Sequence, residues 1–406
     1  MIPRDLFEVA FDPAFGRQMR FITGPRQSGK TTLAKQKLKQ EGCESCYFNW
    51  DLRSIRTRYR ENPFFYSGTY YALPKGPKKF WICFDEIHKM PKWKNILKGG
   101  FDEKEKETQF IVTGSARMDW FRKSGDSLAG RYFLFRLFPV TLRELFRSKS
   151  TFSPPKNASD FIEAQLSTKC SEEEIFSNLL NLGGFPEPLT KQSKTFHQKW
   201  QEAYTDQIVR EDLRDLTGIR ELENVAALCQ ILPARIGSPL SLNALHEDLE
   251  VSYNAVRGYL RALELAYMTF SLSPYQHRII RSVKKEKKVY FYDWTRVADP
   301  SIRFENFVAV QLQARLALWN DRGLGPFELF YVRTKDGKET DFLVTRQRMP
   351  WLLLEAKLSP QSISPHHFRH AEQLGEIPFI QIVRTTKEAE KKGKRYWTIS
   401  ANRLLC

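Results

Sequence analysis

The sequence predicts an α/β fold class, and three observations lead to this prediction. Short apolar segments alternate with helix-patterned segments through residues 1 to about 145, which is typical of a parallel sheet. The first apolar segment leads directly into a glycine-rich turn followed by a helical pattern. Strands and helices alternate again from Val289 onward. The strands expected in the first part are residues 18–23, 46–50, 80–85, 109–113 and 132–137.

Composition indicates a globular protein with a polyanionic partner. Of 406 residues, 41% are hydrophobic and 27% are charged, which is ordinary for a folded domain. Lys and Arg number 64 against 47 Asp and Glu, a net charge of +17. Such an excess favours nucleic acid as a partner, with an anionic membrane surface second. Simple solubility is the alternative explanation of the charge.

Several protein classes are not expected. No apolar run approaches the roughly 18 residues that a membrane span needs. The first 15 residues lack the pattern of a secretory signal, so we expect a cytoplasmic protein. Six cysteines are too few for a disulfide framework in this length. Cys43 and Cys46 form a lone CxxC without the further ligands of a zinc site.

Composition and pattern divide the chain into segments. Residues 1–147 form the first α/β domain, and residues 148–160 are rich in Ser and Pro, as a linker or surface loop would be. Residues 160–236 are helical, and residues 237–277 have the pattern of a helix-turn-helix with a wing. A basic run covers residues 278–288. Residues 289–406 form a second α/β domain.

The glycine-rich turn matches GxxxxGK[ST] at every defined position, between a strand and a helix as this motif requires. Glycines let backbone N–H groups approach phosphates at a helix N-terminus. Lys30 is expected to reach the β- and γ-phosphates of ATP, and the Thr31 hydroxyl to bind Mg²⁺. No motif that distinguishes ATP from GTP is visible. The expected nucleotide-binding residues are Gly24, Pro25, Arg26, Gln27, Ser28, Gly29, Lys30, Thr31 and Thr32.

An apolar segment that ends in Asp85 and Glu86 supplies the second half of this site. Strand carboxyl ends meet at one edge of a parallel sheet, where the ligand lies. Asp85 is expected to bind Mg²⁺, and Glu86 to orient or deprotonate the attacking water. Ser115, after the next strand, is a candidate sensor of the γ-phosphate or the water, or else part of a turn. Arg131 is a candidate arginine finger for a neighbouring subunit, or an ordinary surface arginine.

Residues 237–277 contain the candidate DNA reader. Ser241 and Ser252 are expected N-caps of two helices, the second of which buries one face. Its other face carries groups suited to groove and phosphate contacts. Winged helices also serve as packing modules, so this alternative stays open. The expected DNA contacts are Tyr253, Asn254, Arg257 and Arg261, together with Arg278, Arg281, Lys284 and Lys285 of the basic run.

A second set of acidic residues lies near the C-terminus. Asp341 begins one expected strand, and Glu355 and Lys357 end the next, on one face of it. Two acids can hold a divalent metal, and the lysine can orient or activate a water for phosphodiester attack. This pattern resembles the PD-(D/E)xK nuclease fold, in which Glu305 matches an additional acid on an upstream helix. Such folds also serve as DNA-binding platforms. His366, His367 and His370 are expected on an exposed helix face.

The strings GPRQSGKTTL, FDEIHKM, TGSARM and SLAGRYFLFRLFPVTLREL, with LGGFPEPL and YTDQIVREDL, resemble a family of prokaryotic AAA-type ATPases over nearly the whole chain. The C-terminal region of this family has long been labelled a domain of unknown function. The resemblance implies an AAA-like core, a helical lid, a winged helix and a nuclease-like C-terminal domain. It implies no defined cellular role.

Three functional hypotheses follow. The first is an oligomeric, Mg²⁺-dependent ATPase that binds DNA and whose nucleotide state controls a nuclease-like domain. The second is a regulatory switch that binds DNA or a protein partner with a catalytically silent nuclease-like fold. The third is a switch independent of DNA, with an acidic protein partner for the basic surface.

Overall fold

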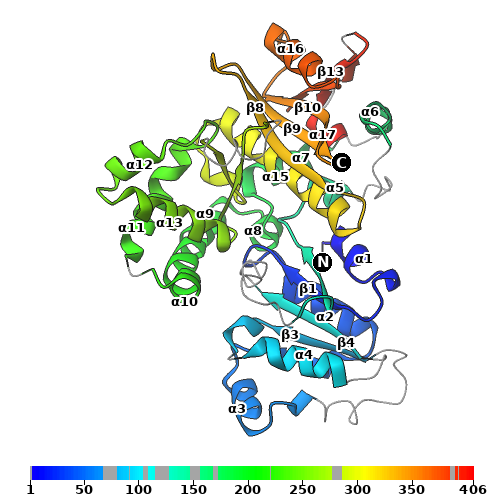
Figure 1. Ribbon diagram of the computed structural model, residues 1–406, viewed down its shortest axis with the longest axis vertical. Helices are drawn as coiled ribbons and strands as arrows, with labels where there is room; N and C mark the ends of the chain where they lie inside the picture. Colours follow the sequence, from blue (N-terminus) through cyan, green and yellow to red (C-terminus); the bar gives the residue numbers. More distant parts are fainter. Residues whose placement is uncertain are drawn as a thin grey trace. The chain divides into compact units, whose positions relative to one another are not determined.

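The computed structural model describes residues 2–66, 80–90, 92–103, 108–114, 128–146, 156–167, 172–219, 221–276, 286–384, 389–391 and 393–406. The chain divides into two compact units. One is Arg4–Phe138, and the other is Pro139–Cys406 together with Met1–Pro3. The bar in Figure 1 locates each unit, and each is described by itself below.

The Arg4–Phe138 unit is built on a parallel sheet. In its described part the sheet has five strands in the order β2-β3-β4-β1-β5, and every neighbouring pair is parallel. All five expected strands are confirmed, at β1 (Met19–Thr23), β2 (Tyr47–Asn49), β3 (Phe80–Asp85), β4 (Thr108–Gly114) and β5 (Tyr132–Arg136). Every residue of β3 is buried, which explains its unbroken apolar sequence. The helices are α1 (Asp5–Ala10), α2 (Lys30–Gln40), α3 (Arg53–Glu61) and α4 (Trp93–Glu103).

The larger unit begins with helices. They are α5 (Leu142–Phe146), α6 (Ala158–Leu166), α7 (Glu173–Leu182), α8 (Pro186–Lys191), α9 (Lys194–Gln207), α10 (Leu213–Thr217) and α11 (Leu222–Ile231). A π-helical turn, Ile208–Asp212, joins α9 to α10. The expected linker at 148–160 is too long, because α6 begins at Ala158. Residues 148–155 lie outside the described residues.

Two helices and a two-stranded ribbon follow. Helices α12 (Leu242–Asp248) and α13 (Tyr253–Leu265) begin at the expected caps, because the Ser241 and Ser252 hydroxyls accept from Ala244 and Ala255 N–H groups. Strands β6 (Thr269–Leu272) and β7 (Lys288–Phe291) pair antiparallel. This order of elements agrees with a winged helix, which stays a prediction.

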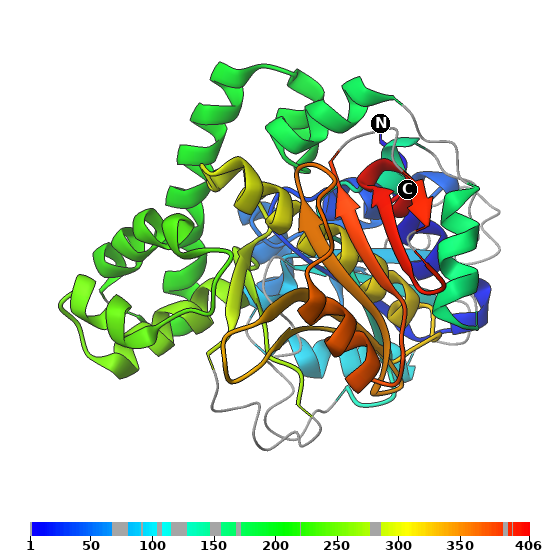
Figure 2. The same ribbon diagram turned by 90° about the horizontal axis from the view of Figure 1, so that it is seen from above.

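The C-terminal sheet has six strands within the described residues, in the order β12-β13-β11-β10-β9-β8. The pairs β10–β11 and β11–β13 are parallel, and the others are antiparallel. Figure 2 shows α15 (Pro300–Asp321) and α16 (Pro365–Gln373) on opposite faces of the sheet. The strands are β8 (Phe327–Arg333), β9 (Glu339–Arg346), β10 (Met349–Lys357), β11 (Phe379–Val383), β12 (Ala389–Lys391) and β13 (Tyr396–Ser400), and the last helix is α17 (Ala401–Leu404).

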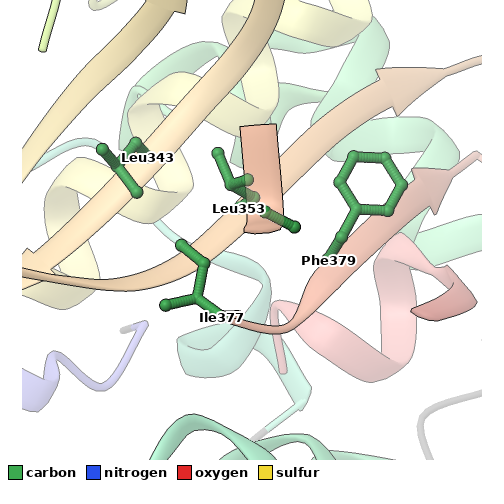
Figure 3. Close-up of a cluster of buried hydrophobic side chains, with 5 residues drawn as sticks. Leu343, Leu353, Ile377 and Phe379 are labelled. Atoms are coloured by element: carbon green, nitrogen blue, oxygen red, sulfur yellow. The ribbon is translucent and has the colours of Figure 1, made fainter. Parts of the chain in front are cut away.

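A buried apolar cluster joins α16 to this sheet. Leu343 of β9, Leu353 of β10 and Phe379 of β11 are each fully buried, with Ile377 and Ala371 beside them. Figure 3 shows Leu353 between Leu343 and Phe379, with Ile377 below. Burial of these side chains holds β9 and β10 in register, and this register places the acidic residues described below.

Within the described residues, no helix is both long and apolar enough to cross a membrane. Cys43, Cys46, Cys83 and Cys229 are buried free thiols, whereas Cys406 is disulfide-bonded. Burial raises the pKa of the Cys46 thiol to about 11, so this cysteine is not a reactive thiolate.

Candidate functional site

The turn between β1 and α2 has the backbone of a phosphate-binding loop. Gly24, Gln27 and Gly29 have φ angles of 145°, 59° and 101°, and α2 begins at Lys30. A Cβ atom at Gly24 would lie 2.0 Å from the carbonyl oxygen of Leu137. The motif therefore needs glycine at position 24 both for its conformation and for this close backbone approach.

Side chains within and beside the loop hold it in shape. The Lys30 ammonium donates to the carbonyl oxygens of Gly24 at 2.9 Å and Pro25 at 2.7 Å. Arg4, which the sequence did not single out, donates to the carbonyl oxygens of Ser28 and Phe138. Among the described residues, the buried Ser28 hydroxyl finds no hydrogen-bond partner. The Ser28 hydroxyl is therefore a buried donor that an anion bound in the loop would satisfy.

Three hydroxyl groups converge on the carboxylate of Asp85. Thr31 Oγ1 donates to Asp85 Oδ2 at 2.8 Å, as the motifs predict for two ligands of one Mg²⁺. The hydroxyls of Tyr47 and Thr113 also donate to Asp85. Tyr47 comes from β2 and Thr113 from β4, the two neighbours of β3. Burial and the Asp85 charge raise the pKa of Tyr47, which keeps its hydroxyl protonated as a donor.

Sequence reasoning assigned neither Tyr47 nor Thr113 to the site. Thr113 stands in register with Asp85, two residues before the candidate sensor Ser115. A polar residue at the end of an apolar strand is the signal that could identify Thr113, whereas the candidate sensor Ser115 lies outside the described residues. Nothing local in the sequence indicates that Tyr47 reaches Asp85.

Glu86 directly follows the buried strand, at φ 55° and ψ 36°. Its backbone N–H donates to the Thr113 carbonyl oxygen at 3.0 Å, and its side chain is half-buried. A non-glycine residue in this left-handed conformation is uncommon, and such residues gather at functional sites. The conformation turns the chain at the sheet edge that carries Asp85, as the proposed role of Glu86 requires.

Arg131 lies beside the N-terminal ends of the strands, whereas the loop follows the carboxyl end of β1. It directly precedes β5, and its carbonyl oxygen accepts from the N–H of Met19, the first residue of β1. Its guanidinium binds Asp102 through two hydrogen bonds, of 2.8 and 3.0 Å. Because the loop follows the opposite end of β1, an arginine-finger role for Arg131 requires a second subunit.

The residues present fit a nucleotide with Mg²⁺. Gly24 and Gly29 have the positive φ angles of a phosphate-binding loop, and the Thr31 hydroxyl and Asp85 carboxylate are oxygen ligands of the type that Mg²⁺ prefers. Lys30 supplies a fixed positive charge beside the cradle.

The proposed DNA-reading face of α13 is exposed as expected. Val256, Tyr259 and Leu263 are buried. Tyr253 is 43% exposed, and Asn254, Arg257 and Arg261 are also exposed. The other expected contacts, Arg278, Arg281, Lys284 and Lys285, lie outside the described residues.

The C-terminal acids and lysine meet as the sequence predicts. Lys357 Nζ lies 2.6 Å from Glu355 Oε1. Asp341 Oδ2 accepts from the Ala356 N–H at 3.0 Å, and the Asp341 N–H donates to Glu355 Oε2 at 3.3 Å. Burial and the charge of Asp341 raise the pKa of Glu355 to about 8.

A lysine outside the predicted set lies among these acids. Lys288 Nζ, which is 0% exposed, lies 3.0 Å from Glu305 Oε1, 2.5 Å from Glu339 Oε1 and 3.5 Å from Asp341 Oδ1. The sequence placed Lys288 in a solvated basic run, whereas it begins β7 as a buried residue. Burial opposes its charge, but Tyr290 and the surrounding carboxylates outweigh burial and raise the pKa of Lys288 well above its ordinary value.

The expectation of an exposed histidine face on α16 is wrong for two of its three members. His367 and His370 are 4% and 2% exposed, and Nδ1 of each lies 2.8 Å from the Thr340 hydroxyl. His366 is half-buried beside a polar pocket of about 300 Å³ that Glu355 and Lys357 also line. The i, i+3 spacing of His367 and His370 points both rings at β9 rather than at solvent.

Three family models match separate parts of the chain. Residues 16–146 match an AAA domain, which agrees with the loop geometry above. Residues 173–295 match a domain of unknown function (DUF8612), and residues 302–404 match another (DUF4143).

Similar proteins exist in bacteria. An uncharacterized protein of Mycobacterium tuberculosis, Rv2008c, is 26% identical over 359 residues, which cover 84% of this chain and 71% of the relative. An uncharacterized protein of Haemophilus influenzae is 22% identical over 320 residues, covering 73% of this chain and 74% of the relative.

Two solved structures align over much of the chain. The Orc1 protein of Aeropyrum pernix, in complex with DNA, is 15% identical with a TM-score of 0.30, over 77% of this chain and 92% of that one. The clamp loader delta protein of Bacillus subtilis is 10% identical with a TM-score of 0.26, over 78% of this chain and 99% of that one. Scores this low carry no inference about this chain.

Proposed function

We propose that this protein is a Mg²⁺-dependent ATPase that binds DNA and whose nucleotide state controls how its C-terminal half engages DNA. The observation that carries the proposal is the convergence of the loop, Lys30, Thr31 and Asp85 at one sheet edge. The match of residues 16–146 to an AAA domain supports it.

Each residue of the site has a defined task in this proposal. The loop N–H groups and the Lys30 ammonium bind the phosphates, and Thr31 and Asp85 hold Mg²⁺, which neutralises charge on the phosphoryl oxygens. Tyr47 and Thr113 fix the Asp85 carboxylate by hydrogen bonds. Glu86 orients or deprotonates the attacking water.

Steady-state ATP hydrolysis in Mg²⁺ tests the catalytic half of the proposal. Lys30→Ala is expected to lose at least 100-fold in turnover, because the phosphates lose their fixed counter-charge. Lys39→Ala is the matched control, since Lys39 is an exposed lysine of the same helix. Equal turnover in wild type and Lys30→Ala would contradict the assignment of the site.

The DNA-binding half rests on different residues. The net charge of +17 and the exposed Tyr253, Asn254, Arg257 and Arg261 of α13 support contact with a polyanion. The nuclease-like assignment of the C-terminal sheet rests on the Asp341, Glu355 and Lys357 pattern. The buried Lys288 favours the second function, a switch whose nuclease-like fold binds without cutting.

Fluorescence anisotropy with labelled duplex DNA tests the assignment of α13. Arg257→Glu with Arg261→Glu should weaken binding at least tenfold at moderate salt and flatten its salt dependence, because each lost phosphate contact removes released counterions. Lys191→Glu with Lys194→Glu makes the same charge change at exposed positions of α8 and α9. If both pairs weaken binding equally, α13 is not the reader.

A further inference from the structure

Lys288 is enclosed by acidic side chains from two different elements. Glu305 comes from α15, and Glu339 and Asp341 come from β9. All three carboxylates lie within 3.5 Å of a lysine nitrogen that is 0% exposed. The Tyr290 hydroxyl also donates to Glu305 Oε1 at 2.7 Å, and Arg333 Nη1 lies 3.1 Å from Glu339 Oε2.

The expected metal does not fit this arrangement. A divalent ion would need the same carboxylate oxygens at about 2.0–2.6 Å. The ammonium group already lies among them, and a second cation there would meet its charge at close range in a poorly solvated site. Among the described residues, no three His, Cys, Asp or Glu side chains are arranged to hold a metal ion.

We propose that Lys288 is a built-in cation that takes the place of a divalent metal in this carboxylate cluster. The C-terminal domain then binds no metal through Glu305 and Asp341, and does not cut DNA by metal-assisted hydrolysis. This inference concerns the C-terminal cluster alone and holds whether or not the loop of the other unit hydrolyses ATP.

A purely structural salt bridge is the competing explanation. Both explanations predict that loss of Lys288 destabilises the fold, because uncompensated carboxylates are left buried. Only the built-in cation predicts that a divalent ion can replace the amine. The Lys288→Met variant separates the two, since methionine keeps most of the side-chain volume without the charge.

Mn²⁺ binding to the full chain without nucleotide, followed by electron paramagnetic resonance, tests the proposal. Lys288→Met is expected to gain one Mn²⁺ site that the wild-type protein lacks. Lys288→Met with Asp341→Asn should lose this site again. A folded Lys288→Met protein that gains no site would overturn the proposal.

The wild-type protein gives an independent answer if Lys288→Met does not fold. Asp341→Asn alone is expected to leave the Mn²⁺ binding of the otherwise intact chain unchanged. The wild-type protein is also expected to leave labelled duplex DNA uncut in Mn²⁺. Mn²⁺ binding or DNA cleavage that disappears in Asp341→Asn would overturn the proposal, while ATP hydrolysis, measured separately, reports on the other unit.

Discussion

The Thr31 hydroxyl donates a 2.8 Å hydrogen bond to the Asp85 carboxylate, which joins two residues 54 positions apart along the chain. Thr31 stands in the first turn of α2, and Asp85 is the last residue of the buried strand β3. The contact forms because parallel strands end at one edge of the sheet, where α2 also begins.

Gly24→Ala is expected to lower nucleotide affinity at least tenfold. Alanine at φ 145° is strained, and its Cβ would lie 2.0 Å from the Leu137 carbonyl oxygen, so the loop must move. Titration with a fluorescent ATP analogue measures the effect. Gly42→Ala is the control, because φ is also positive there, at 68°, but the Cβ meets nothing within 4 Å. Equal losses in both variants would assign the effect to general destabilisation.

Tyr47→Phe is expected to raise the Mg²⁺ concentration at half-maximal ATP turnover by about tenfold. The variant removes one of the hydroxyls that fix Asp85, and loss of such a supporting partner typically costs 10- to 100-fold in metal affinity or activity. Tyr59→Phe makes the same chemical change on α3, where the ring packs against Trp50. An unchanged Mg²⁺ dependence in Tyr47→Phe would show that Thr31 and Thr113 are sufficient to fix the Asp85 carboxylate.

Arg131→Ala is expected to lose ATP turnover because Arg131 acts as an arginine finger on the nucleotide of a neighbouring subunit. Complementation between two inactive variants should therefore reveal this role. A mixture of inactive Arg131→Ala and inactive Lys30→Ala subunits should recover part of the activity, since some interfaces combine an intact loop with an intact arginine. Asp102→Ala, which removes the carboxylate that binds Arg131, should stay active. If mixed oligomers of confirmed composition recover no ATP turnover, Arg131 is an ordinary surface residue and not an arginine finger.

Local sequence patterns were sufficient to predict the first sheet. Unbroken apolar runs such as residues 80–85 mark strands buried on both faces, and the spacing of the loop fixes the start of α2. Asp341, Glu355 and Lys357 also meet as predicted, because strand alternation and a hairpin place them together.

Residues whose position depends on distant contacts could not be predicted. Lys288 belongs to a charged run in sequence, and only the acids of α15 and β9 make its burial possible. His367 was likewise expected at the surface, but Thr340 and Phe379 enclose its ring. Tyr47 reaches Asp85 only because β2 and β3 are neighbours in the sheet.

The contribution of His367 to stability is expected to fall as the pH drops below about 6.5, the ordinary histidine pKa. Burial, together with His366, His370 and Lys357, lowers the pKa of His367 to about 3. Between these values this residue binds more protons in the unfolded chain, so its contribution to the free energy of unfolding decreases by up to roughly 2 kcal/mol at pH 5.

Denaturant unfolding between pH 5 and 7.5 measures this loss. The free energy of unfolding of wild type minus that of His367→Gln should decrease by up to roughly 2 kcal/mol from pH 7.5 to pH 5, because glutamine does not titrate. His246→Gln on α12 leaves His367 in place and should keep the wild-type profile. A His367→Gln profile parallel to that of the wild type would contradict the assignment.

The measurement that tests the central claim most directly is ATP hydrolysis in Mg²⁺ with and without duplex, single-stranded and branched DNA, with the same reactions run on a gel. The account predicts turnover that depends on Lys30, rises several-fold with DNA at low salt, and leaves the DNA uncut. Turnover that no DNA changes, in a protein that binds none of them, would contradict the coupling of nucleotide state to DNA.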